Sequence, residues 1–390
     1  MTSNARTKLN TNSNTNDDTK SFNYNYKKRG TNHLQKRASL FFAAIVLSAS
    51  ALFGGNYILN TNKSADISTV TSAPANTTLS VTFLNVGQGN CVIAESNGHY
   101  MLIDGGNSEY SSKVVSYLHD LNITALDYIV ISHYDADHLS GIIGVLNNFN
   151  VTKVISPDYE ADTKTYGSYI SIMNKKSYTA IHPSIGDIYN LGGATFKIVS
   201  PIKYSYEDEN NNSVGIRLTD GAHSFLILGD AEVQSESDII NSGEDLSCDV
   251  YMVSHHGSSN SSTNALLDIA NPSVAVISVG KNDYGHPTEQ TLNRLSSHNI
   301  SILRTDQDGT IIAYSGKDFL EWNVNFDTKS IKKEAVSNNS TETSYIGNKN
   351  SLKFHLPTCP NLPAVGNQVY FDSREDAVDS GYSPCGVCKP

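Results

Sequence analysis

From residue 79 onward, short apolar runs alternate with turn residues, and this pattern predicts a domain rich in β-strands. Three successive runs, at 79–87, 90–96 and 99–106, are separated by turn residues and predict antiparallel neighbours. Helical patterns then alternate with apolar runs, which is typical of a layered α/β or α+β sandwich. Further strands are predicted at 127–132, 151–156, 194–200, 213–219, 223–229, 249–254, 273–278, 300–304 and 309–315, with helices near 110–121, from Asp137, and at 231–241, 262–270 and 287–297.

Low-complexity and linker-like segments flank this region. Residues 1–37 are rich in Asn, Thr, Ser and Lys with almost no apolar content, so we expect them to be disordered. Residues 60–78 and 327–343 are polar and aperiodic and predict two linkers. The expected organisation is therefore one large domain at 79–326 and a small module at 344–390.

An uncharged, mostly apolar segment at 38–59 follows the basic N-terminus, which predicts a secretory signal peptide or a membrane anchor. The short apolar core at 40–47 and the small-x-small sequence at 49–51 favour a cleaved signal, whereas the long basic stretch and the apolar residues that resume up to Leu59 favour an anchor. A buried globular helix is the third alternative. Both membrane interpretations place the remainder outside the cell, either secreted or held at the membrane through 38–59.

The charge is distributed unevenly along the chain. Eight of the 28 Lys and Arg residues but only two of the 39 Asp and Glu residues lie in 1–38, which leaves 20 basic and 37 acidic residues, a net charge of −17, for the rest. An acidic body argues against a broad basic surface for nucleic acid, because phosphate binding rests mainly on Lys and Arg. A phosphate ligand would need another source of positive charge.

Candidate metal ligands gather where apolar strands stop. The run at 127–132 is followed by His133, Asp135, Asp137 and His138, four ligands within six residues at a strand end and a helix start. A helix N-terminus alone would favour acidic residues here, but it does not explain two histidines as well. Asp or His also follows three other predicted strands, at Asp104, Asp230, His255 and His256. Strand ends at one sheet edge are where such proteins assemble sites.

These motifs, in this order, resemble those of the metallo-β-lactamase superfamily. The segments LNVGQGN at 84–90, SHYDADHLSG at 132–141, NNNS at 210–213, SHHGS at 254–258 and YGHP at 284–287 resemble, more narrowly, the hydrolase domain of ComEC-type DNA-uptake competence proteins. The resemblance covers roughly residues 80–320. Three departures are Asp135 in place of the commoner His, the segment 210–213 where a further His is usual, and Asn90 in place of the usual Asp.

The resemblance implies a four-layer αββα sandwich with two divalent metal ions, zinc or manganese, in a cleft at one edge. His133 and Asp135 would hold the first ion, Asp137 and His138 the second, and Asp230 would bridge them. The resemblance also implies that His256 is a further ligand of the second ion. His255 and His286 would contact the phosphate or the leaving group. The residues that would orient the ligands are Asp104, Asn210 and Ser213.

Two of these assignments also rest on local expectations. His255 should point away from His256, because neighbouring residues on a strand face opposite sides. His286 has a competing interpretation as a loop residue that caps the helix after Pro287.

The implied chemistry is hydrolysis by a water deprotonated between two cations, with Asp137 part of the catalytic centre. We therefore expect an exported metal-dependent phosphodiesterase, with DNA as the first candidate substrate. A phosphodiesterase for a wall polymer or a phosphorylcholine-type substrate is the alternative enzyme, since an acidic body suits a small or choline-bearing ligand better than duplex DNA. The alternative outside enzymes is a surface protein that binds DNA without cleaving it. The oligomeric state is not predicted.

The C-terminal module has its own cluster. His355-x₃-Cys359 and Cys385-x₂-Cys388 have the spacing of a closed tetrahedral zinc site, which would supply folding energy that a small core lacks. A disulfide from Cys359 to Cys385 or Cys388 is the alternative, although it would leave one thiol and His355 unused. The segment 345–390 resembles the Ada-like metal-binding module, which implies one structural zinc and a contact with DNA.

Overall fold

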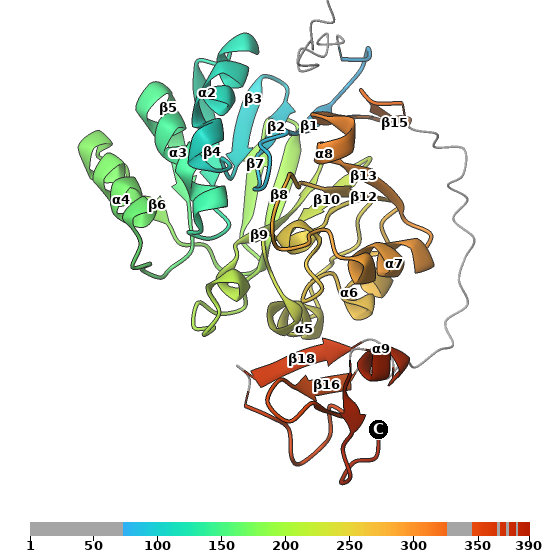
Figure 1. Cartoon of the computed structure of the whole chain (residues 1–390). Helices are drawn as coiled ribbons and strands as arrows, with labels where there is room; N and C mark the ends of the chain where they lie inside the picture. Colours follow the sequence, from blue (N-terminus) through green and yellow to red (C-terminus); the bar gives the residue numbers. More distant parts are fainter. Residues whose placement is uncertain (1–72, 326–344, 365–366, 372–373, 380) are drawn as a thin grey trace, which may run out of the picture. The chain divides into compact units, whose positions relative to one another are not determined.

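The computed structural model describes residues 73–325 and 345–390, apart from 365–366, 372–373 and 380 (Figure 1). The predicted disordered segment 1–37, the signal or anchor at 38–59, most of the first linker and the second linker lie outside the described residues. Within the described part of the chain, no helix is both long and apolar enough to cross a membrane.

The first sheet combines an antiparallel meander with a parallel half. Its order is β15-β14-β1-β2-β3-β4-β5-β6. The predicted antiparallel pairing of the first three strands is confirmed, and β3 to β6 then run parallel. The bounds are Leu79–Phe83 (β1), Val92–Ser96 (β2), His99–Ile103 (β3), Ala125–Val130 (β4), Asn150–Ile155 (β5), Ala180–Ile181 (β6), Ile311–Gly316 (β14) and Phe319–Trp322 (β15).

The second sheet has the order β13-β12-β11-β10-β9-β8-β7. Its strands from β7 to β10 are antiparallel, and those from β10 to β13 are parallel. The bounds are Ile188–Leu191 (β7), Ala194–Ser200 (β8), Gly215–Thr219 (β9), Ser224–Ile227 (β10), Val250–Met252 (β11), Val274–Ile277 (β12) and Ser301–Arg304 (β13).

Helices cover the outer face of each sheet, which gives the four-layer αββα sandwich that the resemblance implies (Figure 1). The period of two along β3 illustrates the layering, because Met101 and Ile103 pack between the sheets while Leu102 packs under the helices. The helices are α2 (Ser111–Asp120), α3 (Ala136–Asn148) and α4 (Lys164–Lys176) on the first sheet, and α5 (Val233–Asn241), α6 (Asn264–Ala270) and α7 (Glu289–Ser297) on the second.

The predicted helices and strands of this domain are present, but α4, β6, β7 and β15 were missed. In α4 only Tyr169, Ile172 and Met173 are buried, so its polar composition obscures the helical period. β7 is half exposed and gives an equally weak alternation. Short helical segments complete the domain at Ser108–Tyr110 (η1), Glu209–Asn212 (η2), Ser254–Gly257 (η3) and Thr305–Asp308 (α8).

The C-terminal region is a separate small sheet of order β18-β16-β17-β19 with one short helix. Its elements are Tyr345–Asn348 (β16), Lys353–His355 (β17), Gln368–Phe371 (β18), Arg374–Asp379 (α9) and Ser383–Pro384 (β19). The buried apolar cluster within it consists of Phe354, Phe371 and Ala377. Such a small core makes a structural metal important for folding.

Candidate metal centre

The loop after β4 delivers two buried histidines and two carboxylates to one edge of the sandwich. His133 and His138 are completely buried, and α3 begins at Ala136 so that Asp137 lies in its first turn. Asp135 precedes the helix, and its Oδ2 lies 3.7 Å from His133 Nε2. A strand that stops just before a helix therefore converts a short sequence motif into converging side chains.

Asp230, which follows β10, lies at the centre of the cluster. Its Oδ1 is 3.3 Å from His138 Nε2, and its Oδ2 is 3.5 Å from His256 Nε2. His256 Nε2 is also 3.4 Å from Asp137 Oδ2. Ligand atoms form two groups, each within 4.8 Å, namely His133 with His138 and Asp230, and Asp137 with His138 and His256. The structure thus gathers residues separated by more than a hundred positions around two overlapping points.

Hydrogen bonds at Nδ1 orient the three buried histidines. His138 Nδ1 is 2.8 Å from Asp104 Oδ2, and His256 Nδ1 is 2.8 Å from the carbonyl oxygen of Ser278, which only accepts. His133 Nδ1 is 3.1 Å from Ser132 Oγ, whose own hydroxyl donates to Asp104. Each ring therefore carries a proton on Nδ1, so Nε2 is the nitrogen that a metal ion would bind, in place of a second proton where the ring carries one.

Four atoms in the cluster are buried and have no hydrogen-bond partner in the part of the chain that the structure describes: Nε2 of His133, His138 and His256, and Oδ1 of Asp230. The close approach of His138 Nε2 and Asp230 Oδ1 lacks the alignment of a hydrogen bond. Burying unpaired polar atoms is costly, so four of them facing one another indicate an absent ligand. Imidazole nitrogens and carboxylate oxygens suit divalent zinc or manganese, and the residues therefore fit a metal pair.

Charge interactions inside the cluster keep its central acid ionised. Burial would raise the pKa of Asp230, but the imidazoles of His138, His256 and His255 hold it well below its usual value. Burial would likewise lower the pKa of His138, yet the carboxylates of Asp230 and Asp104 raise it well above the usual value. The site therefore favours a negative carboxylate at the point where two cations would meet.

Two glycines allow the loop after β3 to touch α3. A Cβ on Gly141 would lie 1.8 Å from the carbonyl oxygen of Gly105, a contact that no side chain tolerates. The approach is held by hydrogen bonds from Gly105 N–H to His138 O and from Gly141 N–H to Gly106 O. It places Asp104 directly behind His138, where its carboxylate orients the ring.

The pair His255–His256 corrects a prediction. Both residues have positive φ, 51° and 52°, because β11 ends at Met252 and the chain turns through the left-handed region. Strand alternation therefore does not apply, and the expectation that His255 points away is wrong. Its Nε2 lies 3.8 Å from Asp230 Oδ2, and its Nδ1 lies 3.1 Å from Glu232 Oε1. Although burial opposes protonation, these two carboxylates raise the pKa of His255 to about 9.

Of the two residues at 210–213 that were predicted to orient the metal ligands, one contacts the cluster and the other bonds within its own turn. Ser213 Oγ is 3.5 Å from His133 Nδ1 and accepts the N–H of Asp230, so it contacts the cluster. Asn210 lies half-buried in η2, where its N–H donates to Asp208 Oδ1. The neighbouring Asn211, which was missed, accepts the N–H groups of Glu232 and Ser235 with its side chain.

His286 lies beside His255, with the two ring centroids 5.4 Å apart. The alternative that it caps α7 is wrong, because the cap is Thr288, whose hydroxyl accepts the N–H of Thr291. Burial and the charges of His255 and His256 lower the pKa of His286 to about 4.

Sequence reasoning missed three other contributors: Ser132, Glu232 and the carbonyl of Ser278. Glu232 could have been recognised from the sequence, because it is an acidic residue two positions after Asp230. The Ser278 carbonyl could not, because every residue has a backbone carbonyl.

A buried network holds the turn that carries His255 and His256. Glu236 on α5 is completely buried, and its carboxylate accepts the N–H groups of Ser262 and Thr263. Arg294 on α7 donates to the carbonyl oxygens of Ser259 and Ser261. Two residues in a rarely populated conformation persist only when their surroundings constrain them. The segment that these bonds fix reaches the turn through the hydroxyl of Ser261, which donates to the carbonyl oxygen of Ser254.

Replacing Glu236 by Ala should therefore destabilise the domain strongly. The change removes the acceptor of one buried N–H group, at Ser262, and of one partly buried N–H group, at Thr263, and an unsatisfied buried group costs about 1–3 kcal/mol. We expect a loss of about 2–5 kcal/mol in the free energy of unfolding, measured by urea denaturation of the full-length chain. The control is the exposed Glu321→Ala, which should change the free energy of unfolding by less than about 0.5 kcal/mol. Equal unfolding curves for the two variants would contradict the assigned role.

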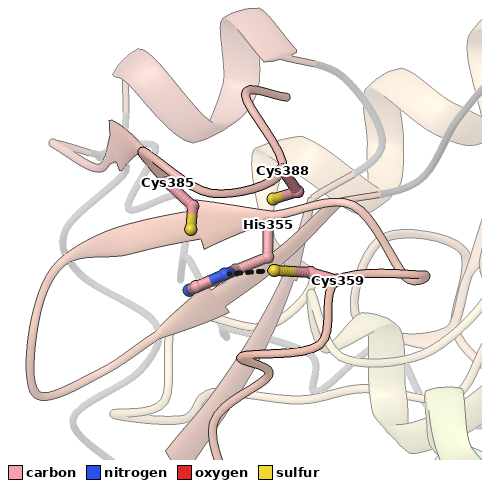
Figure 2. A group of neighbouring side chains, drawn as sticks. All are labelled: His355, Cys359, Cys385 and Cys388. Carbon is pink, nitrogen blue, oxygen red and sulfur yellow. Dashed lines mark hydrogen bonds between the residues drawn. The ribbon is translucent and has the colours of Figure 1, made fainter.

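The C-terminal cluster brings His355, Cys359, Cys385 and Cys388 together, and Figure 2 shows their side chains pointing toward one another. His355 Nδ1 is 3.3 Å from Cys359 Sγ. The N–H of Leu356 donates to Cys388 Sγ, and that of Val387 donates to Cys385 Sγ. The N–H donors of Cys388 and Val387 lower the pKa of the Cys385 thiol, which favours the thiolate that zinc binds.

The disulfide alternative does not describe this structure, because the three cysteines of the module are free thiols. Three sulfurs and one imidazole nitrogen within 4.8 Å of one another match a closed four-ligand zinc site. The residues that the sequence predicted are therefore gathered, and they fit the metal.

Comparison with known proteins matches both regions. Residues 84–281 match the Metallo-beta-lactamase superfamily, which is half of the chain, and residues 333–390 match the Metal binding domain of Ada. Among solved structures, the metallo-beta-lactamase fold protein YhfI from Bacillus subtilis aligns with 15% identity and a TM-score of 0.40, covering 58% of this chain and 95% of that one.

Two curated relatives are competence proteins. ComE operon protein 3 of Bacillus subtilis (strain 168) is 26% identical over 250 residues, which is 59% of this chain and 32% of that protein. Competence protein ComA of Neisseria gonorrhoeae is 28% identical over 234 residues, which is 59% of this chain and 31% of that protein. The chain thus spans about a third of the length of these relatives.

Proposed function

The chain belongs to the metallo-beta-lactamase superfamily, and we propose on that premise that it is an exported metal-dependent phosphodiesterase that cleaves DNA. The comparisons support a metallo-β-lactamase-fold hydrolase that is related to competence proteins. The observation that carries the proposal is the set of four buried, unpartnered ligand atoms at the meeting point of His133, His138, His256 and Asp230. These atoms supply the nitrogen and oxygen ligands that a metal-dependent hydrolase requires.

Six side chains would hold two divalent cations. His133 and Asp135 would hold one, Asp137, His138 and His256 the other, and Asp230 would contact both. When bound, such ions activate water as a nucleophile and stabilise negative charge on a phosphoryl group. Asp104, Ser132 and the Ser278 carbonyl keep the three imidazoles in the tautomer that presents Nε2 to the cluster.

His255 and His286 would act on the substrate itself. Glu232 fixes the His255 ring through Nδ1, so that Nε2 faces Asp230 and the cluster. His286 stands next to it, with an Nδ1 that is buried and has no hydrogen-bond partner among the described residues. We assign these rings to contact with the phosphate and to proton transfer to the leaving oxygen.

DNA is proposed as the substrate because of the competence-protein relatives and the resemblance to the ComEC-type hydrolase domain. Divalent ions would provide the positive charge that the acidic body lacks. Export and attachment to the membrane rest on the apolar segment 38–59, and contact of the C-terminal zinc module with DNA belongs to the same proposal.

The test is cleavage of plasmid DNA, both double-stranded and heat-denatured, by the full-length chain in mild detergent, with Mn²⁺ or Zn²⁺. We expect His133→Ala to abolish cleavage and to reduce metal content, measured by mass spectrometry. The matched control is His99→Ala. This change removes an exposed imidazole at the start of β3, whereas Asp104 and the metal ligands lie beyond the end of that strand. Hydrolysis of phosphorylcholine esters or of model phosphodiesters, without cleavage of DNA, would select the alternative phosphodiesterase. Failure of the metal-loaded wild type to cleave any ester would reject the enzyme proposal.

A further inference from the structure

An exposed tyrosine stands at the outer end of the row of rings that leads from the metal centre. Tyr284 is 75% exposed. Its ring centroid is 5.8 Å from that of His286, with the two planes 32° apart. The His286 ring is in turn 5.4 Å from His255, whose Nε2 faces Asp230. The row therefore connects the proposed cleavage point to a solvent-facing aromatic surface.

The loop that carries Tyr284 is held in place by one side chain. The Asn282 side chain donates from Nδ2 to the carbonyl oxygens of Gly280 and His286. Its Oδ1 accepts the N–H groups of Tyr284 and His286. Four bonds from one amide fix the backbone on both sides of Tyr284, so the point from which the exposed ring projects is set before a ligand arrives. A backbone that is already ordered lowers the conformational entropy lost on binding.

An acidic protein needs a source of affinity for DNA other than charge attraction. The chain after residue 38 has a net charge of −17, so its backbone contacts with a polyanion are weak compared with those of a basic protein. In the loop itself, the exposed Lys281 and Asp283 oppose each other in charge. Stacking of bases on aromatic rings binds nucleic acid without net positive charge, and every base offers a face for it.

We propose that Tyr284 is a stacking platform for a nucleobase adjacent to the cleaved phosphodiester, and that the substrate is consequently single-stranded. The inference rests on the proposed function and specifies its substrate. Inside a duplex both faces of each base are covered by its neighbours, so an exposed ring stacks on an unpaired or terminal base. Tyr284 is then a specificity-determining residue, and His286 and His255 lie between the stacked base and the metal ligands.

The test compares two single-stranded oligonucleotides, one intact and one with abasic residues on both sides of the cleaved position. With the full-length, metal-loaded chain, Tyr284→Ala should raise the KM for the intact oligonucleotide roughly 5- to 150-fold, the range expected for one stacked base. Tyr284→Phe should retain the wild-type KM within about 3-fold, because stacking does not need the hydroxyl. The control Ile188→Ala removes an exposed apolar side chain on β7 and should leave KM unchanged.

The abasic oligonucleotide separates stacking from a general loop effect. On the abasic oligonucleotide, wild type should have a KM as high as that of Tyr284→Ala on the intact oligonucleotide. Tyr284→Ala should raise the KM for the abasic oligonucleotide little further, since the base and the ring act as a pair. Equal effects of Tyr284→Ala on both oligonucleotides would overturn the stacking proposal while leaving the hydrolase proposal intact. Absence of cleavage of either oligonucleotide by wild type would instead reject the DNase proposal, and this inference with it.

Discussion

Replacing Asp230 by Asn is expected to eliminate hydrolysis, with a loss of at least about 10³-fold in kcat/KM. The amide preserves the size of the side chain but removes the charge at the centre of the cluster. Asp230 is the carboxylate that faces His138, His255 and His256 at once. Without it the group of His133 and His138 loses its carboxylate, and the group of Asp137, His138 and His256 loses the second carboxylate, which lies 3.5 Å from His256 Nε2, so the binding of both divalent ions should fail.

Two measurements check this result independently. Metal content of the purified full-length chain should fall to the ion of the C-terminal module alone, and cleavage of DNA should cease. Asp268→Asn is the matched control, because that carboxylate is exposed and pairs only at the surface with His298. An Asp230→Asn protein that keeps both ions and cleaves at the wild-type rate would show that the six residues do not form the proposed centre.

Removing one thiolate from the C-terminal cluster is expected to unfold residues 345–390. The buried core of Phe354, Phe371 and Ala377 supplies only a few kcal/mol, whereas a structural zinc contributes about 10–16 kcal/mol in small zinc modules. Cys385→Ser should therefore lose the zinc and the hydrogen-bonded sheet together. Limited proteolysis of the full-length chain should then cut within the module at least tenfold faster, while the larger domain stays protected.

The comparison variant is Ser383→Ala, which alters an exposed side chain two residues before Cys385 and keeps all four ligands. It should be as resistant to protease as wild type and should bind the same amount of zinc. Chelation of wild type should reproduce the Cys385→Ser pattern, and restored zinc should reverse it in wild type alone. A module that stays protected after complete zinc removal would mean that its apolar core suffices.

Local sequence patterns accounted for most elements of the larger domain and for the identity of the candidate ligands. An apolar strand followed directly by Asp or His is visible without any structure, and so is the spacing from His355 to Cys388. The same patterns failed for α4 and β7, whose exposed polar positions hide the period. They also misplaced His255, since strand alternation was extended past the residue where β11 ends.

The primary sequence by itself determined which chemical groups this protein carries and that they follow strand ends, because hydrophobic periodicity is a local property. Only the tertiary structure decided where those groups point. The left-handed turn at His255 and His256, the contact of Gly105 with Gly141, the carbonyl of Ser278 behind His256 and the buried Glu236 depend on segments that meet from distant parts of the chain. Orientation at a site is set by backbone angles and long-range packing, which no short window of sequence contains.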